Sequence, residues 1–357
     1  MNYLSFPDLE EIEKIPLFFI IGRSRSGTTL LKSMLNAHKN LILPVECTFI
    51  LQLSRKYIKI GMWDKKVIDS FICDIKKTWL FPGLNVDIGI LRDHLYKFEG
   101  KLDYLTICKS VILHTPLIYQ KNAILLAGDK NPSYSVLFKK LYSLFGNKCK
   151  YIYLVRDYRD QFVSLKNAGI EIPDISVSTK RWVDSYNTIY SISQGNKENF
   201  HFLKYEDLVM QPEHELMKIC LFLGIVFDPG MLYFNCQNED LRKVYSEHDL
   251  NGVHKSILNP VNADKIGIWK EQLSKSQVGI ADNIARKCAI TLGYSESGTE
   301  QRLHYFILSL PGIILYYIAI FSEKLLAIAP FKLYLKYSGG AFFGSLWNSC
   351  IRKLKTT

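Results

Sequence analysis

The sequence predicts an α/β fold in which a parallel β-sheet is flanked by helices, and three observations favour it. An uncharged apolar run, Leu17–Ile21, has the pattern of a strand buried on both faces, and a loop and a helical pattern follow it. Further short apolar segments alternate with helical patterns along the chain. Polar clusters come directly after several of these segments, where the carboxyl ends of parallel strands form a binding edge.

The expected elements follow the same alternation from the N-terminus onward. We expect strands at Leu17–Ile21, Leu41–Val45, Ala123–Ala127, Lys150–Val155 and Phe200–Lys204. We expect helices at Ser26–Ala37, before Phe145, before Ala168 and across Met217–Leu223. From about residue 50 to 120 the pattern is mostly helical, polar and basic, and we interpret it as a helical insertion over the site.

The composition favours a folded protein with an anionic partner. Hydrophobic residues make up 48% of the 357 residues, which is enough for a sizeable core. The formal net charge of +11 indicates a phosphorylated ligand, an acidic substrate, nucleic acid or a membrane surface as partner. The eight cysteines contain no C-x-x-C pair, which favours free thiols in a reducing compartment. Because the acidic N-terminus lacks a long apolar core, we expect neither a signal peptide nor a signal anchor.

The loop after the first predicted strand has the spacing of a phosphate-binding loop. Gly22 and Gly27, followed by Thr28 and Thr29, match G-x-x-x-x-G-K-[ST], except that Thr28 replaces the lysine. Backbone N–H groups and the helix dipole favour an anion at such a helix start. The missing lysine argues against a triphosphate, since that lysine contacts the β- and γ-phosphates. The alternative is an ordinary turn with solvated arginines.

Three other polar groups follow predicted apolar segments. Arg156 ends one strand and Ser164 lies about two helical turns later, so an arginine fork and a hydroxyl can hold a second phosphate. The alternative there is an Arg–Asp surface pair. Lys130 can neutralise charge on a leaving phosphate, or can simply be solvated. Glu46 follows an apolar segment that can raise its pKa and make it a general base; otherwise it caps a helix or pairs with a basic residue.

Together these segments resemble the sulfotransferases that use 3′-phosphoadenosine 5′-phosphosulfate (PAPS). The run Arg25-Ser26-Gly27-Thr28-Thr29-Leu30 is similar to the family's 5′-phosphosulfate loop, and residues 155–164 are similar to its 3′-phosphate segment. The branch that contains the tyrosylprotein sulfotransferases is nearest in pattern. It has a glutamate at about the distance of Glu46 and a motif similar to Asp129-Lys130-Asn131-Pro132. The resemblance extends from about residue 16 to 269.

The resemblance implies how the donor is bound. The 5′-phosphate would be bound by the backbone N–H and hydroxyl groups of one loop, namely Ser26, Gly27, Thr28 and Thr29. Arg156 and Ser164 would hold the 3′-phosphate, and Tyr205 would lie near the adenine. PAPS has one phosphate at its 5′ end, which accounts for the missing loop lysine, and no metal ion is implied.

The resemblance also implies an in-line transfer of the sulfuryl group. Glu46 would take the proton of the acceptor hydroxyl as its oxygen attacks sulfur. Arg25 and Lys130 would stabilise the charge that builds up on the sulfuryl and bridging oxygens. One departure stands out, because the family lysine that precedes a tryptophan is Ile268 here. Lys265 and Lys270 are the candidates to replace it.

The C-terminal segment is apolar and basic. We divide the chain into a sulfotransferase domain, residues 1–300, and a C-terminal segment, residues 301–357. Leu303 to Ser322 has no charged residue but is interrupted by Pro311-Gly312, and basic and aromatic residues follow it. We favour an interfacial amphipathic hairpin over a tail packed on the domain, and place a membrane span third. We expect a cytoplasmic protein, peripheral at the inner face of a membrane.

The function that this pattern favours is sulfuryl transfer from PAPS to a hydroxyl, with a glycan or glycolipid as the expected acceptor. Sulfation of protein tyrosine and a kinase-like nucleotide-binding protein are the alternatives. Thr28 in place of the loop lysine argues against the kinase-like alternative. No nucleic-acid-binding motif accompanies the basic charge, so we expect no nucleic-acid partner. The sequence leaves the oligomeric state open.

Overall fold

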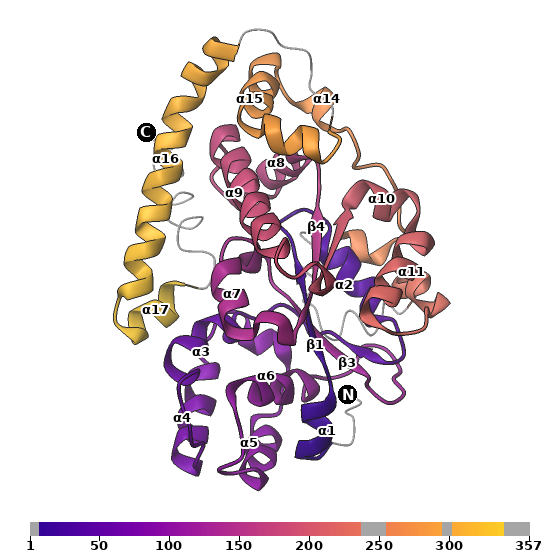
Figure 1. Cartoon of the computed structure of the whole chain (residues 1–357), viewed down its shortest axis with the longest axis vertical. Helices are drawn as coiled ribbons and strands as arrows, with labels where there is room; N and C mark the ends of the chain where they lie inside the picture. Colours follow the sequence, from indigo (N-terminus) through magenta and orange to yellow (C-terminus); the bar gives the residue numbers. More distant parts are fainter. Residues whose placement is uncertain (1–6, 237–254, 295–301, 339–357) are drawn as a thin grey trace.

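The computed structural model describes residues 7–236, 255–294 and 302–338, and a five-stranded parallel sheet lies at its centre (Figure 1). The strands are ordered β2-β3-β1-β4-β5 across the sheet. Their bounds are β1 (Leu17–Ile21), β2 (Leu41–Ile42), β3 (Leu126–Lys130), β4 (Lys150–Val155) and β5 (Phe200–Lys204). The predicted fold class, a phosphate-loop-like parallel sheet flanked by helices, is confirmed.

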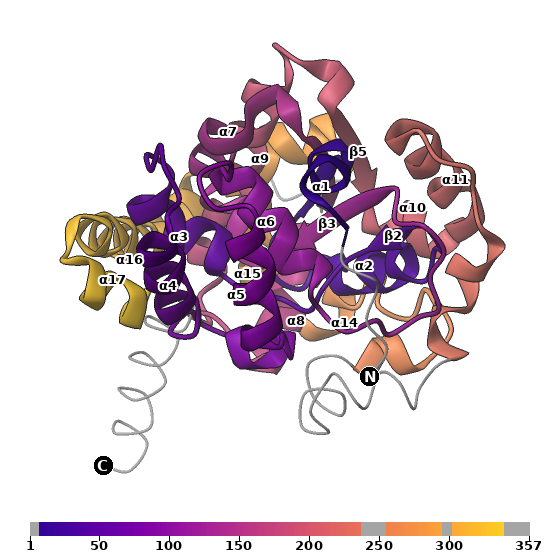
Figure 2. The same ribbon diagram turned by 90° about the horizontal axis from the view of Figure 1, so that it is seen from below.

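Helices cover both faces of the sheet (Figures 1 and 2). Those named in the site or the core are α2 (Thr28–Asn36), α3 (Phe49–Tyr57), α8 (Tyr158–Ala168), α9 (Ile175–Ser193), α10 (Tyr205–Met210), α11 (Pro212–Leu223), α14 (Trp269–Gln272) and α15 (Lys275–Thr291). The others are α1 (Leu9–Lys14), α4 (Lys65–Ile75), α5 (Ile88–Lys97), α6 (Tyr104–Leu113), α7 (Phe138–Phe145), α16 (Arg302–Ile328) and α17 (Phe331–Tyr337). Short 3-10 helices occupy Phe81–Leu84, Pro132–Ser135, Gly146–Lys148, Lys197–Asn199, Pro229–Cys236 and Lys255–Leu258.

The uncharged first strand is apolar throughout because its two faces belong to two hydrophobic cores. Phe18 and Ile20 of β1 pack into the core beneath α2, α10 and α11. Leu17, Phe19 and Ile21 face the opposite core, which includes side chains of α3, α6, α7 and α9. Successive side chains of a strand point to opposite faces, so a strand between two helical layers has no solvent side.

The predicted strand bounds Lys150–Val155 and Phe200–Lys204 are confirmed, whereas the strand predicted at Ala123–Ala127 is shifted. The observed strand β3 begins three residues later and includes two charged residues that look like loop in the sequence. Asp129 and Lys130 pair with Phe19 and Ile20 of β1, and both are buried. A strand with buried charges at its carboxyl end gives no apolar pattern there.

The second predicted strand is shorter than expected, and the segment after it leads to the insertion. β2 ends at Ile42 rather than Val45, and Pro44 has no N–H group for a longer ladder. Helices α3 to α6 then fill the region predicted to be a helical insertion and lie together at one end of the molecule (Figure 1). Side chains from each of them enter the core that also contains α7 and α9.

The C-terminal segment forms a long helix, α16, against α9 and α15 (Figures 1 and 2). The predicted break at Pro311-Gly312 is wrong, because α16 continues through Pro311 and ends only at Ile328. Among the described residues, α16 is the helix long and apolar enough to cross a membrane, with a mean hydropathy of 1.9 over an 18-residue window within Leu303–Ile328. Helix α17 follows it, and residues 339–357 of the predicted tail lie outside the described ranges.

Candidate functional site

The carboxyl ends of the strands bring the predicted site residues to one edge of the sheet. The strands are parallel, and the registers pair Ile20 with Lys130 and Ile21 with Tyr153. The loop after β1 therefore lies between the end of β3, which carries Lys130, and the end of β4, which leads into Arg156. This is the edge at which open parallel sheets bind ligands.

The loop after β1 depends on two glycines. A β-carbon on Gly22 would lie 2.8 Å from the Leu154 carbonyl oxygen, and one on Gly27 would lie 2.4 Å from the Tyr205 ring. Gly27 also has a φ of 93°, which favours glycine. Because Gly27 begins α2 without a side chain, it supplies no cap to the first-turn N–H groups of that helix. Arg25 has a φ of 68°, a strained conformation that is concentrated at functional sites.

Glu46, Lys130 and Thr29 form the first cluster of the site. The Lys130 ammonium pairs with the Glu46 carboxylate and donates a hydrogen bond to the Thr29 hydroxyl at 2.9 Å. Lys130 is buried, and burial, with the positive charges of Lys32 and Arg25, lowers its pKa well below the ordinary value. The buried amine of Lys130 therefore contacts both the partly exposed carboxylate of Glu46 and the first turn of α2.

Two further charged groups lie behind this cluster. Lys32 on α2 is buried, and burial lowers its pKa to about 7, opposed by the charge of Asp129. Burial raises the pKa of Asp129 to about 6, although the Tyr134 hydroxyl donates a hydrogen bond to its carboxylate. The site thus holds two buried amines, Lys32 and Lys130, whose pKa values burial lowers.

The second cluster joins the β1 loop to the end of β4. The Arg25 guanidinium donates from Nε to the Ser164 hydroxyl at 3.0 Å. Arg156 Nη1 donates to the Arg25 carbonyl at 3.1 Å, and the Arg156 guanidinium lies 4.5 Å from the centre of the Tyr205 ring. The Arg25 side chain therefore lies on the Ser164 side of the loop. Its predicted contact with the sulfuryl group stays a prediction.

Gln161 on α8 holds the loop from the other side. Its amide nitrogen donates to the Ser26 hydroxyl at 2.8 Å and to the Ser24 carbonyl at 2.9 Å. Gln161 and Ser26 are both buried. Gln161 has no signal in the sequence, since its role depends on α8 returning beside the β1 loop.

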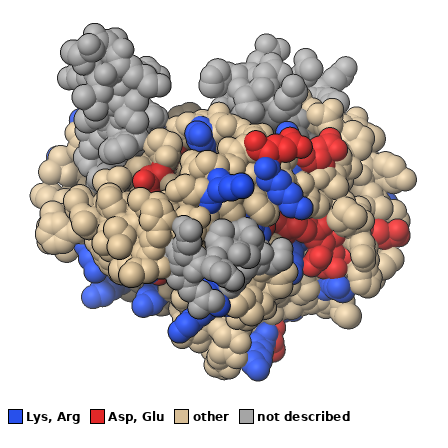
Figure 3. All heavy atoms as spheres, turned by 90° about the horizontal axis from the view of Figure 1, so that it is seen from above, with Lys and Arg blue, Asp and Glu red and all other residues tan. Residues whose placement is uncertain are grey.

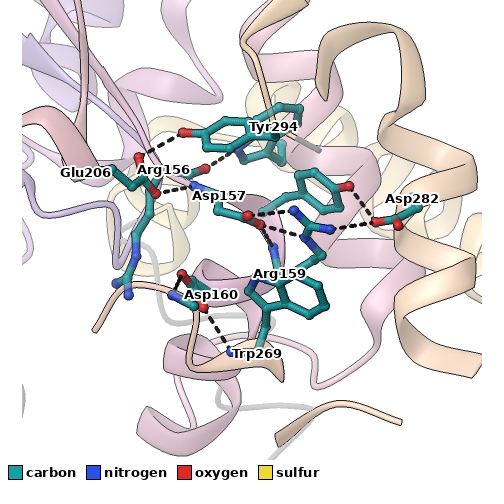
Figure 4. A network of polar contacts seen from close by, with 11 residues as sticks. Arg156, Asp157, Arg159, Asp160, Glu206, Trp269, Asp282 and Tyr294 are labelled. Carbon is teal, nitrogen blue, oxygen red and sulfur yellow. Dashed lines mark hydrogen bonds and ion pairs between the residues drawn. The ribbon is translucent and has the colours of Figure 1, made fainter. Parts of the chain in front are cut away.

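A carboxylate network fixes the segment at residues 265–269 over the end of β4 (Figure 4). Asp160 accepts hydrogen bonds from the Gly267 N–H at 2.7 Å and the Trp269 N–H at 2.9 Å. Arg156 Nη2 donates to the Lys265 carbonyl at 2.5 Å. The segment is therefore attached to α8 and to Arg156 through its backbone.

Arg159 and Glu206 complete the network in Figure 4. Arg159 forms ion pairs with Asp157 and Asp282, and its guanidinium lies 4.0 Å from the centre of the Trp269 ring. Glu206 accepts from the Asp157 N–H at 2.9 Å, and its other oxygen accepts from Tyr294 at 3.0 Å. These groups bring β4, α10, α14 and α15 together around Arg156.

The position predicted to lack the family lysine lies beside this network. Ile268 is the residue before α14, between the two N–H groups that Asp160 accepts from. The side chains of Lys265 and Lys270, the predicted substitutes, are exposed. None of the described hydrogen bonds or ion pairs involves either ammonium.

The arrangement leaves donors for an anion on both sides of the loop. Arg156 Nε is buried and has no acceptor among the described residues, and the start of α2 supplies backbone N–H groups. Donors at two places along one edge are the arrangement that we expect for a ligand with two separate phosphate groups. Within the described residues, no group of three or more His, Cys, Asp or Glu side chains is placed to hold a metal ion.

Comparisons with known proteins agree with this geometry. The model of the sulfotransferase family matches residues 16–229 of this chain. A protein-tyrosine sulfotransferase of Drosophila melanogaster is 24% identical over 297 residues, which are 79% of this chain and 52% of that protein. A 3-beta-hydroxysteroid sulfotransferase of Cavia porcellus is 35% identical over 171 residues, which are 42% of this chain and 58% of that protein. The chain thus spans little more than half the length of these relatives.

A solved structure shares the fold. The sulfotransferase domain from the Synechococcus PCC 7002 olefin synthase has a TM-score of 0.53 and 20% identity, covering 83% of this chain and 99% of that domain. The family match includes the β1 loop, Glu46, Lys130, Arg156, Ser164 and Tyr205. On the strength of a match over more than half of its residues, the chain belongs to the sulfotransferase family.

Proposed function

We propose that the protein transfers a sulfuryl group from PAPS to a hydroxyl acceptor. The observation that supports this proposal is that two clusters with basic side chains lie along one sheet edge. The loop from Ser26 to Thr29, with the start of α2, would bind the 5′-phosphate through backbone N–H and hydroxyl groups. The buried, unpaired Nε of Arg156 and the Ser164 hydroxyl would bind the 3′-phosphate.

Tyr205 and Gln161 support this binding mode. The Tyr205 ring lies against Gly27 and beneath the Arg156 guanidinium, so it shapes the space between the two phosphate sites. Gln161 holds the Ser26 hydroxyl in place. Arg25 lies between the clusters, with its side chain on Ser164, and from there it would contact either phosphate end.

Glu46 and Lys130 would assist the reaction in different ways, Glu46 by accepting a proton and Lys130 by stabilising negative charge. The acceptor oxygen would form a bond to sulfur while the bond from sulfur to the 5′-phosphate oxygen breaks in line, and Glu46 would receive the hydroxyl proton. Lys130, next to Thr29 at the 5′-phosphate loop, would stabilise charge on the departing oxygen. The contact with Lys130 holds the Glu46 carboxylate next to the 5′-phosphate loop, where a general base would have to lie.

For the acceptor, we propose a hydroxyl of a glycan or glycolipid. The support is the exposed apolar side of α16, which would place the site close to a lipid surface. Protein tyrosine is the second candidate, because the Drosophila melanogaster relative is named a protein-tyrosine sulfotransferase.

Calorimetry with 3′-phosphoadenosine 5′-phosphate (PAP), the desulfonated donor, tests the donor assignment. We expect binding to the full chain, and we expect Arg156→Ala to weaken it about 30-fold, since hydrogen bonds to charged groups are worth about 2 kcal/mol. Adenosine 5′-phosphate, which lacks the 3′-phosphate, is the matched ligand, and its affinity should change much less. Absence of PAP binding to the unaltered protein would contradict the donor assignment.

Transfer of labelled sulfate separates the two acceptor classes. The full chain and labelled PAPS would be incubated in parallel with a glycolipid extract, soluble glycans and tyrosine-containing acidic peptides. We expect label in the glycan or glycolipid arms. Label in the peptide arm alone would replace our acceptor by protein tyrosine while leaving the donor assignment intact.

A further inference from the structure

Helix α16 packs against the rest of the molecule through its small and polar residues. Ser309 is fully buried, Ala319 and Tyr316 are nearly so, and these positions repeat at helical spacing on one side. Gly312 lies on the same side, where a β-carbon would be 2.3 Å from an Asp174 carboxylate oxygen. On the contact side these small and polar residues are joined by the partly buried side chains of Tyr305, Leu315 and Ile320.

The large apolar residues of α16 lie on the opposite side, exposed. Seven of them are more than half exposed. Tyr317 is one, and the other six repeat at intervals of three, four or seven residues: Leu303, Ile307, Ile314, Ile318, Phe321 and Ile328. In an ordinary surface helix these residues would face the core. The helix is about 39 Å long. Its exposed apolar residues form one strip along this length, whereas an ordinary protein surface has single exposed apolar residues at scattered positions.

Polar contacts attach α16 to α9 and determine which way the strip faces. The Tyr316 hydroxyl donates to Asp184, and Glu323 pairs with Arg181 at 2.8 Å. A position across a bilayer would expose these charged partners on α9 to hydrocarbon, which is strongly unfavourable. A helix that lies along a surface keeps both contacts and buries only its apolar strip.

The charges beside the strip match an anionic surface. No charged residue occurs from Leu303 to Ser322, while Lys324, Lys332 and Lys336 follow and are exposed. From residue 324 to 357 the sequence has six Lys or Arg and no Asp or Glu. If a second copy of this chain bound here through the same segment, that segment would bring no Asp or Glu to pair with these lysines. In Figure 3, which views the molecule from above, the side on which α16 lies in Figure 1 is mostly uncharged where described residues are drawn.

We propose that α16 lies in the plane of an anionic lipid bilayer, with its apolar strip in the boundary between headgroups and acyl chains. The exposed lysines after residue 323 would contact the phosphate groups of the lipids. The same helix then turns into α17, where Tyr334 packs between Arg55 of α3 and Lys140. Because α3 begins three residues after Glu46, the lipid contact and the candidate site belong to one connected body. The proposal does not depend on the identity of donor or acceptor.

Flotation of the full chain with vesicles tests the proposal. We expect the protein to float with vesicles of phosphatidylcholine and phosphatidylglycerol, and more weakly with phosphatidylcholine alone. The triple variant Ile314→Gln, Ile318→Gln, Phe321→Gln should lower the affinity for vesicles by at least about tenfold, because it removes apolar groups from the strip. Lys324→Gln, Lys332→Gln and Lys336→Gln together should weaken the preference for the anionic vesicles, since they remove three of the six cations from residue 324 onward.

Two controls separate lipid binding from loss of folding or from other occupants. Leu221→Gln replaces an apolar residue that is 82% exposed on α11, away from α16, and should leave flotation unchanged. The melting temperatures of this variant and of the triple variant should both equal that of the unaltered protein. Failure of the unaltered protein to float would overturn the proposal. So would resistance to alkaline carbonate extraction, which indicates a span, or a dimer that the triple variant dissociates, which indicates a second copy.

Discussion

The two sides of the candidate site are built on opposite electrostatic principles. On the side of Lys130 and Lys32, buried amines of like charge lie close together, and burial lowers the pKa of both. On the side of Arg156, the neighbouring Arg159 is paired with two carboxylates, and Asp160 is satisfied by backbone N–H groups. Lys130 on the first side already pairs with Glu46, and we expect an arriving anion to stabilise this side further, whereas ion pairs and backbone hydrogen bonds within the protein hold the second side.

This difference divides the work that each side would perform. An anion would stabilise the charged forms of buried basic groups most strongly where burial disfavours those forms. We therefore expect the first side to stabilise the negative charge that builds up during the transfer. A pre-formed network costs little reorganisation on binding, which suits recognition of a fixed phosphate. Substitutions on the two sides should therefore affect turnover and affinity unequally.

The largest expected effect is on the first side. Glu46→Gln removes the proposed base but keeps a similar shape, so we expect turnover to fall at least about 100-fold. Binding of PAP should remain within a few-fold, since Glu46 contacts Lys130 and not the 3′ side. Turnover of labelled PAPS and calorimetry with PAP measure the two quantities.

A matched substitution checks that the effect is specific to this carboxylate. Glu198→Gln changes an exposed glutamate in the short 3-10 helix before β5 and should leave turnover unchanged. If Glu46→Gln kept full turnover, Glu46 would not be the base. The charge on the first side would then act on the leaving group alone.

The second side should respond mainly in affinity and stability. Asp160→Asn keeps the size of the side chain but weakens its two hydrogen bonds to the 265–269 segment, a loss of about 1–3 kcal/mol in folding stability. We expect a lower melting temperature and PAP binding weakened by about tenfold or less, with kcat nearly unchanged. A fall in kcat with unchanged PAP affinity would place Asp160 in the reaction rather than in the support of the segment.

The sequence predicts the first side better than the second. Gly22, Gly27 and Thr29 lie within one short motif, and local spacing is enough to identify a phosphate loop. Lys130 was identified as a site residue, yet its strand was placed too early, since buried charges have no apolar pattern.

The second side combines residues that are far apart in the chain. Asp160 accepts from residues more than a hundred positions later, and Glu206 meets Tyr294 across a similar interval. Such pairs depend on how α8, α10 and α15 pack, and no spacing within the sequence reveals them. The continuous helix α16 was missed for a related reason. Pro311-Gly312 predicts a break in the helix, but α16 continues through this pair and packs along α9.

The smallest effect is a pH dependence of stability on the first side. Burial lowers the pKa of Lys32 to about 7 in the folded protein, below its ordinary value of 10.5. Between about pH 7 and about pH 10 the unfolded chain then binds more protons at this residue, so folding stability should rise with pH across that window.

Removing the amine should remove this contribution. We expect the melting temperature of the unaltered protein to rise by a few degrees more between pH 7 and pH 9 than that of Lys32→Met, with about 2–4 °C for each kcal/mol. Saturating PAP should reduce the rise, because a bound anion favours the protonated amine and raises its pKa. An identical pH profile for both proteins would show that Lys32 is not protonated on unfolding in this range, and the contrast between the two sides would then depend on Lys130 alone.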